Sequence, residues 1–284
     1  MEFKAKDRRL EGDTTLRQCQ LVQLFLLEVF DAICKEFGLR YFLDFGTLLG
    51  AVRHGGAIPW DDDLDVSMPE DDYRKFLAIA PNVLPKGVLL QTPFANGGWF
   101  TGISRLRDCK SFYCESWTNP SQPSGIYIDI YPLLSRKKLP RSIGNSLFDL
   151  QHVAYCNLIG NKIAQSYSVA QVWRHALMSF VWKFTAIVAH LIEFIVSLFL
   201  MKRCWTQLPG PTSCYRQFLN DDIFPLKNIC YEGSQFPAPN KMEKILEVYY
   251  GDWRRLPPES KRNPRDKMKL VLPMQAPDEW WAKS

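Results

Sequence analysis

Trp60-Asp-Asp-Asp-Leu-Asp-Val66 is the stretch that decides how this chain is interpreted. From Asp63 to Met68, polar and apolar residues alternate with period two, which predicts a strand with one polar face. Asp63 and Asp65 then point to the same side of that strand, with Cα atoms roughly 6.5–7 Å apart. Two carboxylates that close repel each other unless a cation lies between them. We therefore predict a divalent metal site on this strand.

Magnesium, or manganese in its place, suits such a site, because a hard divalent cation prefers oxygen ligands and commonly takes one or two carboxylates plus substrate phosphates. Residues 126–131 alternate in the same way, and Asp129 on their polar face is the candidate third carboxylate. A solvated acidic turn is the alternative, but Leu64 and Val66 tie the acidic strand to a core. A calcium-binding EF-hand is excluded, because Val66 stands where that loop needs glycine.

A Gly46-Thr47 pair lies upstream, between a predicted strand over residues 40–45 and a short predicted helix over residues 48–52. Glycine permits close backbone approach, and a hydroxyl at a helix N-terminus favours phosphate oxygens. Alone this signal is weak, because strand–glycine–helix turns are common. The nearby aspartates strengthen it, since they would place a metal beside the phosphate. Arg53 is a further candidate for phosphate contact, with a surface ion pair as the alternative.

The remaining patterns predict an α/β fold. Helical periodicity is found over residues 15–37, 70–80 and 240–250, and strand-like patterns over residues 88–92, 100–106 and 126–131. Asn240 and Glu243 are predicted to form a capping box at the start of the last helix. After residue 140 helical patterns dominate. We therefore predict an α/β domain over residues 1–140 and a mostly helical part over residues 141–284.

The composition is near that of an average globular protein, with 46% hydrophobic residues, 23% charged residues and a net charge of +5. This charge is too small to indicate a nucleic-acid partner. The eight cysteines have neither zinc-site nor compact disulfide spacing, so we expect mostly reduced thiols and a reducing compartment. Residues 1–16 lack the apolar core of a signal peptide, and we expect a cytoplasmic location.

Residues 172–201 form a nearly unbroken apolar block. On a helix, its polar positions fall within a stripe about 80° wide; they are His175, Ser179, Lys183, His190, Glu193 and Ser197. A membrane span over residues 184–201, a helix buried among others and a helix in the membrane interface all stay open, although His190 and Glu193 make a span costly. We favour peripheral contact at the inner membrane face through residues 172–203, because Lys202 and Arg203 could meet anionic headgroups.

Two consecutive stretches resemble the signature of a known family. Phe45-Gly-Thr-Leu-Leu-Gly-Ala-Val-Arg-His-Gly-Gly56 and Ile58-Pro-Trp-Asp-Asp-Asp-Leu-Asp-Val66 are similar to the LicD/fukutin signature. Weaker similarity continues in Ile128–Leu133 and in three C-terminal segments, Tyr231–Gly233, Tyr249–Asp252 and Leu256–Pro258. The similarity thins through residues 140–215. Tyr131 is a conservative departure, because the family favours Phe at that position.

The resemblance implies a nucleotidyltransferase (polymerase-β-like) core with a mixed sheet and helical C-terminal additions. It also implies transfer of phosphocholine or a polyol phosphate from a CDP-activated alcohol donor to a hydroxyl of a glycan or glycolipid acceptor. In that picture Asp63 and Asp65 hold Mg²⁺, and Asp129 either ligates the metal or accepts the hydroxyl proton. Gly46-Thr47 faces the donor diphosphate, and Asp61 belongs to the same motif as a further metal candidate.

Some assignments stay open at this point. Arg105 and Arg107 are candidate phosphate clamps, with surface cations as the alternative. A choline head would need an aromatic cage, for which the candidates, more often core residues, are Trp99, Phe100, Phe112, Tyr113, Trp117 and Tyr127. Two rival functions are nucleotidyl transfer from an NTP and a catalytically silent, membrane-associated scaffold. The intact acidic residues count against the scaffold.

Overall fold

The computed structural model describes the chain in several stretches. These are residues 3–92, 103–115, 125–137, 203–207, 216–263 and 268–271, together with helical positions between 181 and 198. The chain divides into two compact units, of which unit 1 holds Met1–Gln91, Ser104–Pro132 and Asp221–Ser284, and unit 2 holds Thr92–Ile103 and Leu133–Asn220. The predicted boundary at residue 140 stays a prediction, because residues 138–180 lie outside the described stretches.

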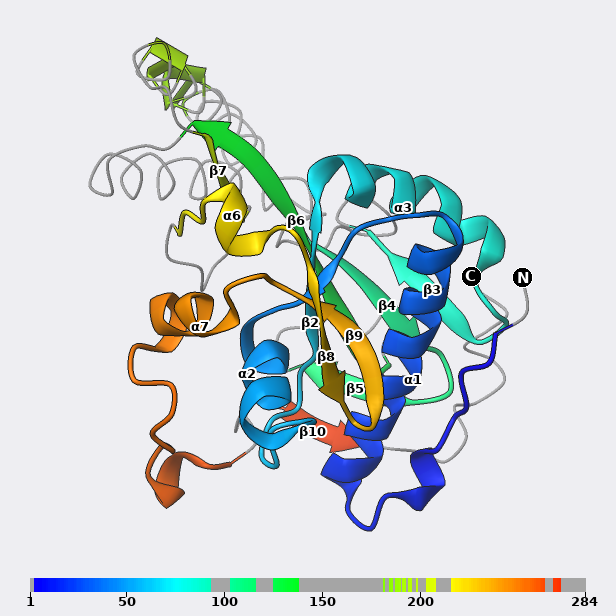
Figure 1. The fold of residues 1–284 in the computed structure, drawn as a ribbon. Coiled ribbons are helices and arrows are strands. Elements are labelled where there is room, and N and C mark those ends of the chain that lie inside the picture. The colour runs from blue at the N-terminus through cyan, green and yellow to red at the C-terminus, as the bar shows by residue number, and fades with distance from the viewer. Residues whose placement is uncertain are drawn as a thin grey trace, which may run out of the picture. The chain divides into compact units, whose positions relative to one another are not determined.

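The fold is mixed α/β and is built on one main sheet, whose strand order is β1–β2–β6–β4–β3 (Figure 1). The strands are β1 (Phe42–Leu43), β2 (Asp65–Pro69), β3 (Val88–Gln91), β4 (Ser104–Asp108) and β6 (Tyr127–Lys137). β1 pairs antiparallel with β2, and β4 pairs antiparallel with both β3 and β6. The C-terminal part of β6, residues 133–137, belongs to unit 2 and pairs antiparallel with β7 (Arg203–Gln207). The order makes β2 and β6, the two acidic strands, direct neighbours.

Helix α1 (Thr15–Glu36) supplies much of the core of unit 1. Its N-cap is Thr14, whose side chain accepts a hydrogen bond from the Arg17 amide, and Gly38 follows with φ +62°. α1 packs against β4 and α3 (Glu70–Val83), and Phe30 meets Phe76 edge to face at 4.9 Å between ring centroids (Figure 1). The predicted helix over residues 15–37 is therefore confirmed within a residue.

Three predicted boundaries near the acidic motif need correction. β2 begins at Asp65, so Asp63 lies in the preceding loop instead of on the strand, and the strand is buried along its whole length. Such burial is typical of a strand enclosed between two neighbours and covered by helices. α2 spans Phe45–His54, which places Gly46-Thr47 inside its first turn. α3 continues through Pro81, at the cost of one hydrogen bond near its end.

The described part of the C-terminal region is richer in strands than we predicted. β8 (Lys227–Tyr231) and β9 (Ser234–Ala238) form a hairpin, and β10 (Met268–Val271) pairs with β5 (Phe112–Glu115). Two short helical elements, α6 (Asn220–Ile223) and η2 (Glu259–Lys261), precede and follow helix α7 (Met242–Tyr250) in the sequence, and η1 (Arg9–Glu11) precedes α1. The expectation of a mostly helical part does not hold for these residues.

The predicted capping box of the last helix is wrong. α7 spans Met242–Tyr250, and its N-cap is Lys241, without a side-chain cap hydrogen bond. Asn240 instead donates to the carbonyl oxygen of Asp221 at 3.0 Å. Glu243 pairs with Arg254 at 2.7 Å. Both side chains therefore have tertiary partners that local capping rules do not anticipate.

Most of residues 172–201 lie outside the described stretches, and the described positions among residues 181–198 are helical. Within the described part of the chain, no helix is long and apolar enough to cross a bilayer. Among the cysteines whose side chains are described, Cys19, Cys34, Cys109, Cys204 and Cys230 are free thiols.

Candidate active site

Two of the predicted carboxylates, Asp65 and Asp129, lie on neighbouring strands. Asp65 opens β2, Asp129 lies on the neighbouring strand β6, and the Asp129 amide donates to the Leu64 carbonyl at 2.8 Å. Burial raises the pKa of Tyr131 well above its ordinary value. The negative charges of Asp65, Asp129 and Asp63 raise it further. The sheet thus brings the predicted residues together from two segments far apart in the sequence.

Asp129 has a buried cationic partner. The Arg105 Nε donates to Asp129 Oδ1 at 2.6 Å, and the two side chains are only 4% and 11% exposed. The Arg105 guanidinium also stacks on Tyr127, with its carbon atom 3.6 Å from the ring centroid. Arg105 is therefore not a surface cation. These contacts fix the orientation of the Asp129 carboxylate.

Arg107 lies two residues further along β4 and is also buried. Its Nε donates to Gln91 Oε1 at 2.6 Å and its guanidinium donates to the Gly125 carbonyl at 2.8 Å. Its side chain is among the largest fully buried ones in the described part of the chain. The surface-cation alternative is wrong here too. Its proposed contact with a donor phosphate stays a prediction.

Gly46 provides the space that Asp61 occupies. A Cβ at Gly46 would lie 2.7 Å from Asp61 Oδ2 and 3.9 Å from Asp63 Oδ1. Gly46 belongs to the first turn of α2, where the helix dipole and the backbone amides favour negative charge. The acidic loop is therefore held against a helix N-terminus, which accounts for glycine at this position.

The start of α2 is joined to β2 by side-chain hydrogen bonds. Asp44 caps the helix, accepting from the Phe45 amide at 2.9 Å and from Ser67 Oγ at 2.6 Å. Thr47 Oγ1 accepts from the Asp65 amide at 2.8 Å, and Thr47 is buried. Thr47 therefore positions the first residue of β2. Its contact with a donor diphosphate stays a prediction.

Two glutamines of α1 position the acidic loop, and sequence reasoning missed them. Gln20 Nε2 donates to the carbonyls of Ile58 and Asp61 at 3.0 and 2.9 Å. Gln23 Nε2 donates to the Asp62 carbonyl at 2.7 Å. Both are buried in a helix whose other buried residues are mostly apolar. Two amides three residues apart on that face were the available signal, because a buried amide requires partners.

The C-terminal hairpin is attached to the same loop. Glu232, at the β8–β9 turn, accepts from the Arg17 guanidinium at 3.0 and 2.6 Å and from the Ala57 amide at 2.9 Å. A Cβ at Gly56 would lie 2.5 Å from Glu232 Oε1. Burial alone would raise the pKa of Glu232, but Arg17 and the Ala57 amide hold that pKa below its ordinary value. The Tyr231-Glu-Gly segment thus links hairpin, α1 and the loop before the aspartates.

Aromatic rings from α2, β6 and α7 pack against one another. Phe45 has φ +44°, and its ring centroid lies 5.0 Å from that of Tyr131 and 4.8 Å from that of Tyr249. Burial raises the pKa of Tyr250, and the charges of Asp65 and other nearby aspartates raise it further. Sequence reasoning did not identify these rings as a group, because they come from three separate elements.

Two of the aromatic residues predicted for a choline cage belong to the core. Tyr113 and Tyr127 are buried and meet edge to face at 5.3 Å, and Tyr113 donates to Asp62 Oδ2 at 3.3 Å. Tyr127 also supports Arg105, so these two rings are part of the core. Phe112 lies on β5. The other three cage candidates, Trp99, Phe100 and Trp117, lie outside the described residues.

Arg53, near the end of α2, contacts both a neighbouring side chain and the C-terminal segment. Its Nε donates to His54 Nε2 at 2.9 Å, and its guanidinium donates to the Trp253 carbonyl at 3.1 Å. Burial lowers the pKa of Arg53, while the nearby Tyr250 and Asp61 act in the opposite direction. The contact of Arg53 with the donor stays a prediction.

The donor set determines which metal could bind here. Among the described residues, no group of three His, Cys, Asp or Glu side chains is arranged to hold a metal ion. Asp63 and Asp65, two residues apart, offer carboxylate oxygens, while Asp129 Oδ1 is paired with Arg105. This set fits an ion such as Mg²⁺, which commonly uses one or two protein carboxylates and completes its shell with water and phosphate. It does not form a closed protein cage.

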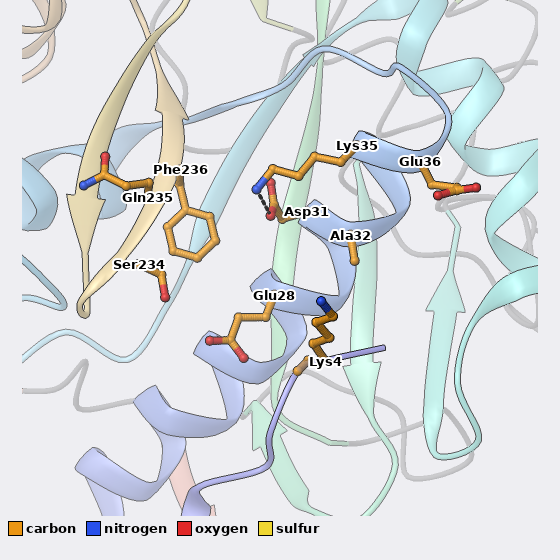
Figure 2. Close-up of a pocket in the computed structure, with 10 residues that line it drawn as sticks. Lys4, Glu28, Asp31, Ala32, Lys35, Glu36, Ser234, Gln235 and Phe236 are labelled. Atoms are coloured by element: carbon orange, nitrogen blue, oxygen red, sulfur yellow. Dashed lines mark hydrogen bonds and ion pairs between the residues drawn. The ribbon is translucent and has the colours of Figure 1, made fainter. Parts of the chain in front are cut away.

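A cavity of about 990 Å³ lies apart from these residues, between α1, Lys4 and the start of β9 (Figure 2). Its charged lining includes Lys35 and Asp31, which pair with each other at 2.6 Å. None of the predicted site residues lines it. The cavity is therefore separate from the candidate active site.

Comparison with known proteins shows which family of domains and which transferase this chain is similar to. The model of the LicD/FKTN/FKRP nucleotidyltransferase domain matches residues 38–141, which contain the acidic loop, β2 and Asp129. The chain is also 28% identical to the lipopolysaccharide cholinephosphotransferase LicD of Haemophilus influenzae, over 88% of this chain and 95% of that protein. Residues 38–141 thus match the domain of the LicD/FKTN/FKRP family, and the chain as a whole is similar to a LicD-type transferase.

More distant relatives match shorter segments. The human ribitol 5-phosphate transferase FKRP is 54% identical over 40 residues, which are 14% of this chain and 8% of that protein. Mannosyltransferase regulator 4 of Saccharomyces cerevisiae is 31% identical over 108 residues, or 37% of this chain and 9% of that protein. The resemblance found in the sequence motifs is therefore confirmed at the level of the family.

Proposed function

We propose that this chain transfers phosphocholine or a polyol phosphate from a CDP-linked donor to a hydroxyl group of a glycan. The main support is that Asp65 and Asp129 lie on the neighbouring strands β2 and β6, with Asp63 just before β2, in the domain that matches the family model. The similarity that spans 95% of a lipopolysaccharide cholinephosphotransferase supports the same reaction. The proposed fold is a polymerase-β-like nucleotidyltransferase core, in which neighbouring strands carry the acidic residues.

Phosphoryl-type transfer depends on positioning and charge neutralisation more than on covalent catalysis. Asp63 and Asp65 would hold Mg²⁺ or Mn²⁺, with Asp61 beside them against α2. When bound, that ion would neutralise the donor diphosphate and stabilise the departing CMP. Gly46, in the first turn of α2, would keep the Asp61 carboxylate close to the helix N-terminus, whose dipole favours negative charge.

Asp129 is proposed to orient the acceptor hydroxyl. Its Oδ1 is paired with Arg105 at 2.6 Å, and Arg105 is itself stacked on Tyr127. This arrangement holds the Asp129 carboxylate in one orientation, in which the proposal has it contact the acceptor hydroxyl. In this proposal Arg105 is a positioning residue, in contrast to the phosphate clamp expected from the sequence.

The proposal is tested by a donor screen with mass detection. The full chain is incubated with Mg²⁺, a saccharide acceptor and, in separate reactions, CDP-choline, CDP-ribitol, CDP-glycerol or CTP. We expect CMP and a phosphodiester-linked saccharide from at least one CDP-alcohol. Pyrophosphate from CTP, without CMP from any CDP-alcohol, would identify a nucleotidyltransferase instead. Absence of any product together with absence of Mn²⁺ binding would favour a silent scaffold.

A further inference from the structure

Two arginines from distant parts of the sequence, Arg53 and Arg262, are joined by the rings of His54 and Trp60. Arg53 Nε donates to His54 Nε2 at 2.9 Å, and the His54 and Trp60 rings meet edge to face at 5.9 Å between centroids. The guanidinium carbon of Arg262 lies 5.5 Å from the centroid of the Trp60 ring. These four residues, called the two-arginine site below, all belong to unit 1.

Neither arginine of this site has an acidic partner. Within the described part of the chain, no carboxylate forms an ion pair with Arg53 or Arg262. Burial lowers the pKa of Arg53 most, and the like charge of Arg262 lowers it further, against the opposite effects of Tyr250 and Asp61. Other described arginines do pair with a carboxylate; they are Arg8, Arg9, Arg17, Arg40, Arg74, Arg105 and Arg254. Guanidinium groups brought together without a carboxylate favour an anion as their partner.

Each arginine is held by a backbone carbonyl and keeps donors for a ligand. Arg53 Nη1 donates to the Trp253 carbonyl at 3.1 Å, and Arg262 Nε donates to the Pro257 carbonyl at 2.8 Å. Among the described residues, Arg53 Nη2 and both Nη atoms of Arg262 have no hydrogen-bond acceptor. Both arginines are half-buried, so a ligand can reach them. A planar fork that is already fixed at one edge loses less entropy when it binds a phosphate.

A purely structural role accounts for one arginine but not for the pair. Arg53 lies in the last turn of α2, where the helix dipole favours a cation, and it ties this helix to Trp253. Arg262 has no such role, because its hydrogen bond reaches only a carbonyl of its own segment. Stacking on Trp60 fixes the direction of Arg262 but does not neutralise it. The two like charges are therefore unfavourable together unless an anion binds there.

The loop that carries Trp60 connects this site to the acidic residues. Trp60 directly precedes Asp61, whose carboxylate lies against Gly46 in the first turn of α2. Arg53 lies in the last turn of the same helix, roughly 10 Å along its axis from Gly46. A substrate of ordinary size that occupies the acidic site can therefore extend to the two arginines.

We propose that Arg53 and Arg262 together bind one phosphate group of a substrate that the acidic site uses. Two substrates could carry this group: the CDP-linked donor, through its diphosphate, and a phosphorylated saccharide acceptor. The inference rests on the proposed function for assigning the phosphate to a substrate. The affinity of the two-arginine site for phosphate does not depend on turnover.

Calorimetric titration of the full chain in EDTA measures phosphate binding without a metal. The probes are inorganic pyrophosphate, CDP-choline and glucose 6-phosphate, with glucose as the uncharged control. We expect at least one phosphate compound to bind, more weakly as salt is raised, and glucose not to bind. Arg262→Gln should weaken that binding about tenfold, because charge-assisted hydrogen bonds are lost. Arg255→Gln makes the same charge change at an exposed residue of the same segment and should bind as wild type does.

A double-mutant cycle tests whether the two arginines hold the same phosphate. Arg53→Lys keeps the charge but loses the planar fork, so we expect it to weaken binding as well. Arg53→Lys/Arg262→Gln should lose less affinity than the product of the two single losses, because both side chains contact one group. The compound whose affinity falls identifies the source of the phosphate, as the donor for CDP-choline and as the acceptor for glucose 6-phosphate.

Three results would overturn the proposal: no binding of any phosphate compound by wild type, equal binding by Arg262→Gln, or a double-variant loss equal to the product of the single losses. If Arg262→Gln lowers the Tm, Arg262→Met keeps the stem packed on Trp60, and the same weakened binding is required of it. Transfer to an uncharged saccharide is followed in parallel with Mg²⁺. Phosphate binding that depends on Arg262, without any transfer, would contradict the proposed function while supporting the two-arginine site.

Discussion

At the scale of single residues, Asp65 is the residue on which the proposed chemistry depends most. It is buried, it is the first residue of β2, and its amide donates a hydrogen bond to Thr47. Replacing Asp65 with Asn removes a charge but keeps the shape, and its backbone hydrogen bond to Thr47 does not involve the side chain. We expect the turnover number to fall about a thousandfold, because metal-borne charge stabilisation is worth several kcal/mol. The exposed Asp71→Asn is the control. Retained turnover of Asp65→Asn, at unchanged Tm, would contradict the role of Asp65.

Arg105 is expected to be important for stability as well as for geometry. Arg105→Ala leaves Asp129 buried without this partner, and breaking a buried ion pair costs about 3–5 kcal/mol of unfolding free energy. Arg74, whose pair with Glu70 is exposed, is the matched control, and Arg74→Ala should change stability little. Urea denaturation measures both. Equal stability of the two variants would rule out a buried pair.

Arg105→Lys separates positioning from phosphate binding. Lysine keeps the charge but loses the planar fork that stacks on Tyr127. We expect a lower kcat with little change of the KM for the donor, because Asp129 loses its orientation. A raised donor KM with normal kcat would instead support the phosphate clamp predicted from the sequence.

The residues that could be predicted at this scale are those whose chemistry is visible in a short motif. Asp63 and Asp65 stand two apart in one segment, so spacing alone brought them together. Gln20 and Gln23 were missed, because their partners are backbone carbonyls of a loop that only the tertiary fold brings to α1. Arg105 was found, but its partner Asp129 depends on the register of β4 and β6, which the sequence does not specify.

At the scale of elements, α2 and the acidic loop are in direct contact at Gly46. Gly46→Ala would place a methyl group 2.7 Å from Asp61 Oδ2, so the loop or the helix must shift. We expect a loss of about 1–3 kcal/mol, as for other overpacked sites. The double variant Gly46→Ala/Asp61→Ala removes the clashing carboxylate and should recover much of the lost stability. Additive losses in this double-mutant cycle would show that the two residues do not touch.

The β8–β9 hairpin should make stability depend on pH through Glu232. The pKa of Glu232 is lower in the folded chain than in the unfolded chain. The stabilising contribution of Glu232 to the free energy of unfolding is therefore fully present above the unfolded pKa of about 4.3, and it is lost as the pH falls through the folded pKa. We expect Glu232→Gln to be less stable than wild type at neutral pH and to show a smaller loss below about pH 4. Chemical denaturation across pH measures this. Glu243→Gln, in an exposed pair, is the control, and identical profiles for Glu232→Gln and wild type would contradict the role of Glu232.

Elements with strong local patterns were predicted well, and those set by tertiary contacts were not. α1 and β3 follow from apolar periodicity and clear stop signals. The β8–β9 hairpin was missed because its turn is Glu232-Gly233, without the Asn or Asp that marks such turns, and because Pro237 within β9 argues against a strand. β2 was correctly predicted as a strand, but its start was placed too early.

At the scale of the whole molecule, the account requires a divalent cation for turnover. Treatment with EDTA should abolish transfer, and Mg²⁺ or Mn²⁺ should restore it. Calcium should restore less, because its larger size and longer oxygen distances suit a different geometry. Full activity after exhaustive chelation would contradict the proposed role of Asp63 and Asp65. Circular dichroism before and after chelation controls for unfolding.

The fate of the donor β-phosphate tests the central claim most directly. The CDP-alcohol that the donor screen selects is labelled with ³²P at its β-phosphate and incubated with Mg²⁺, the saccharide acceptor and the full chain. The account predicts that the label moves to the saccharide while unlabelled CMP is released, and that Asp65→Asn transfers almost none. Label that stays with the nucleotide, or equal transfer by Asp65→Asn, would contradict it.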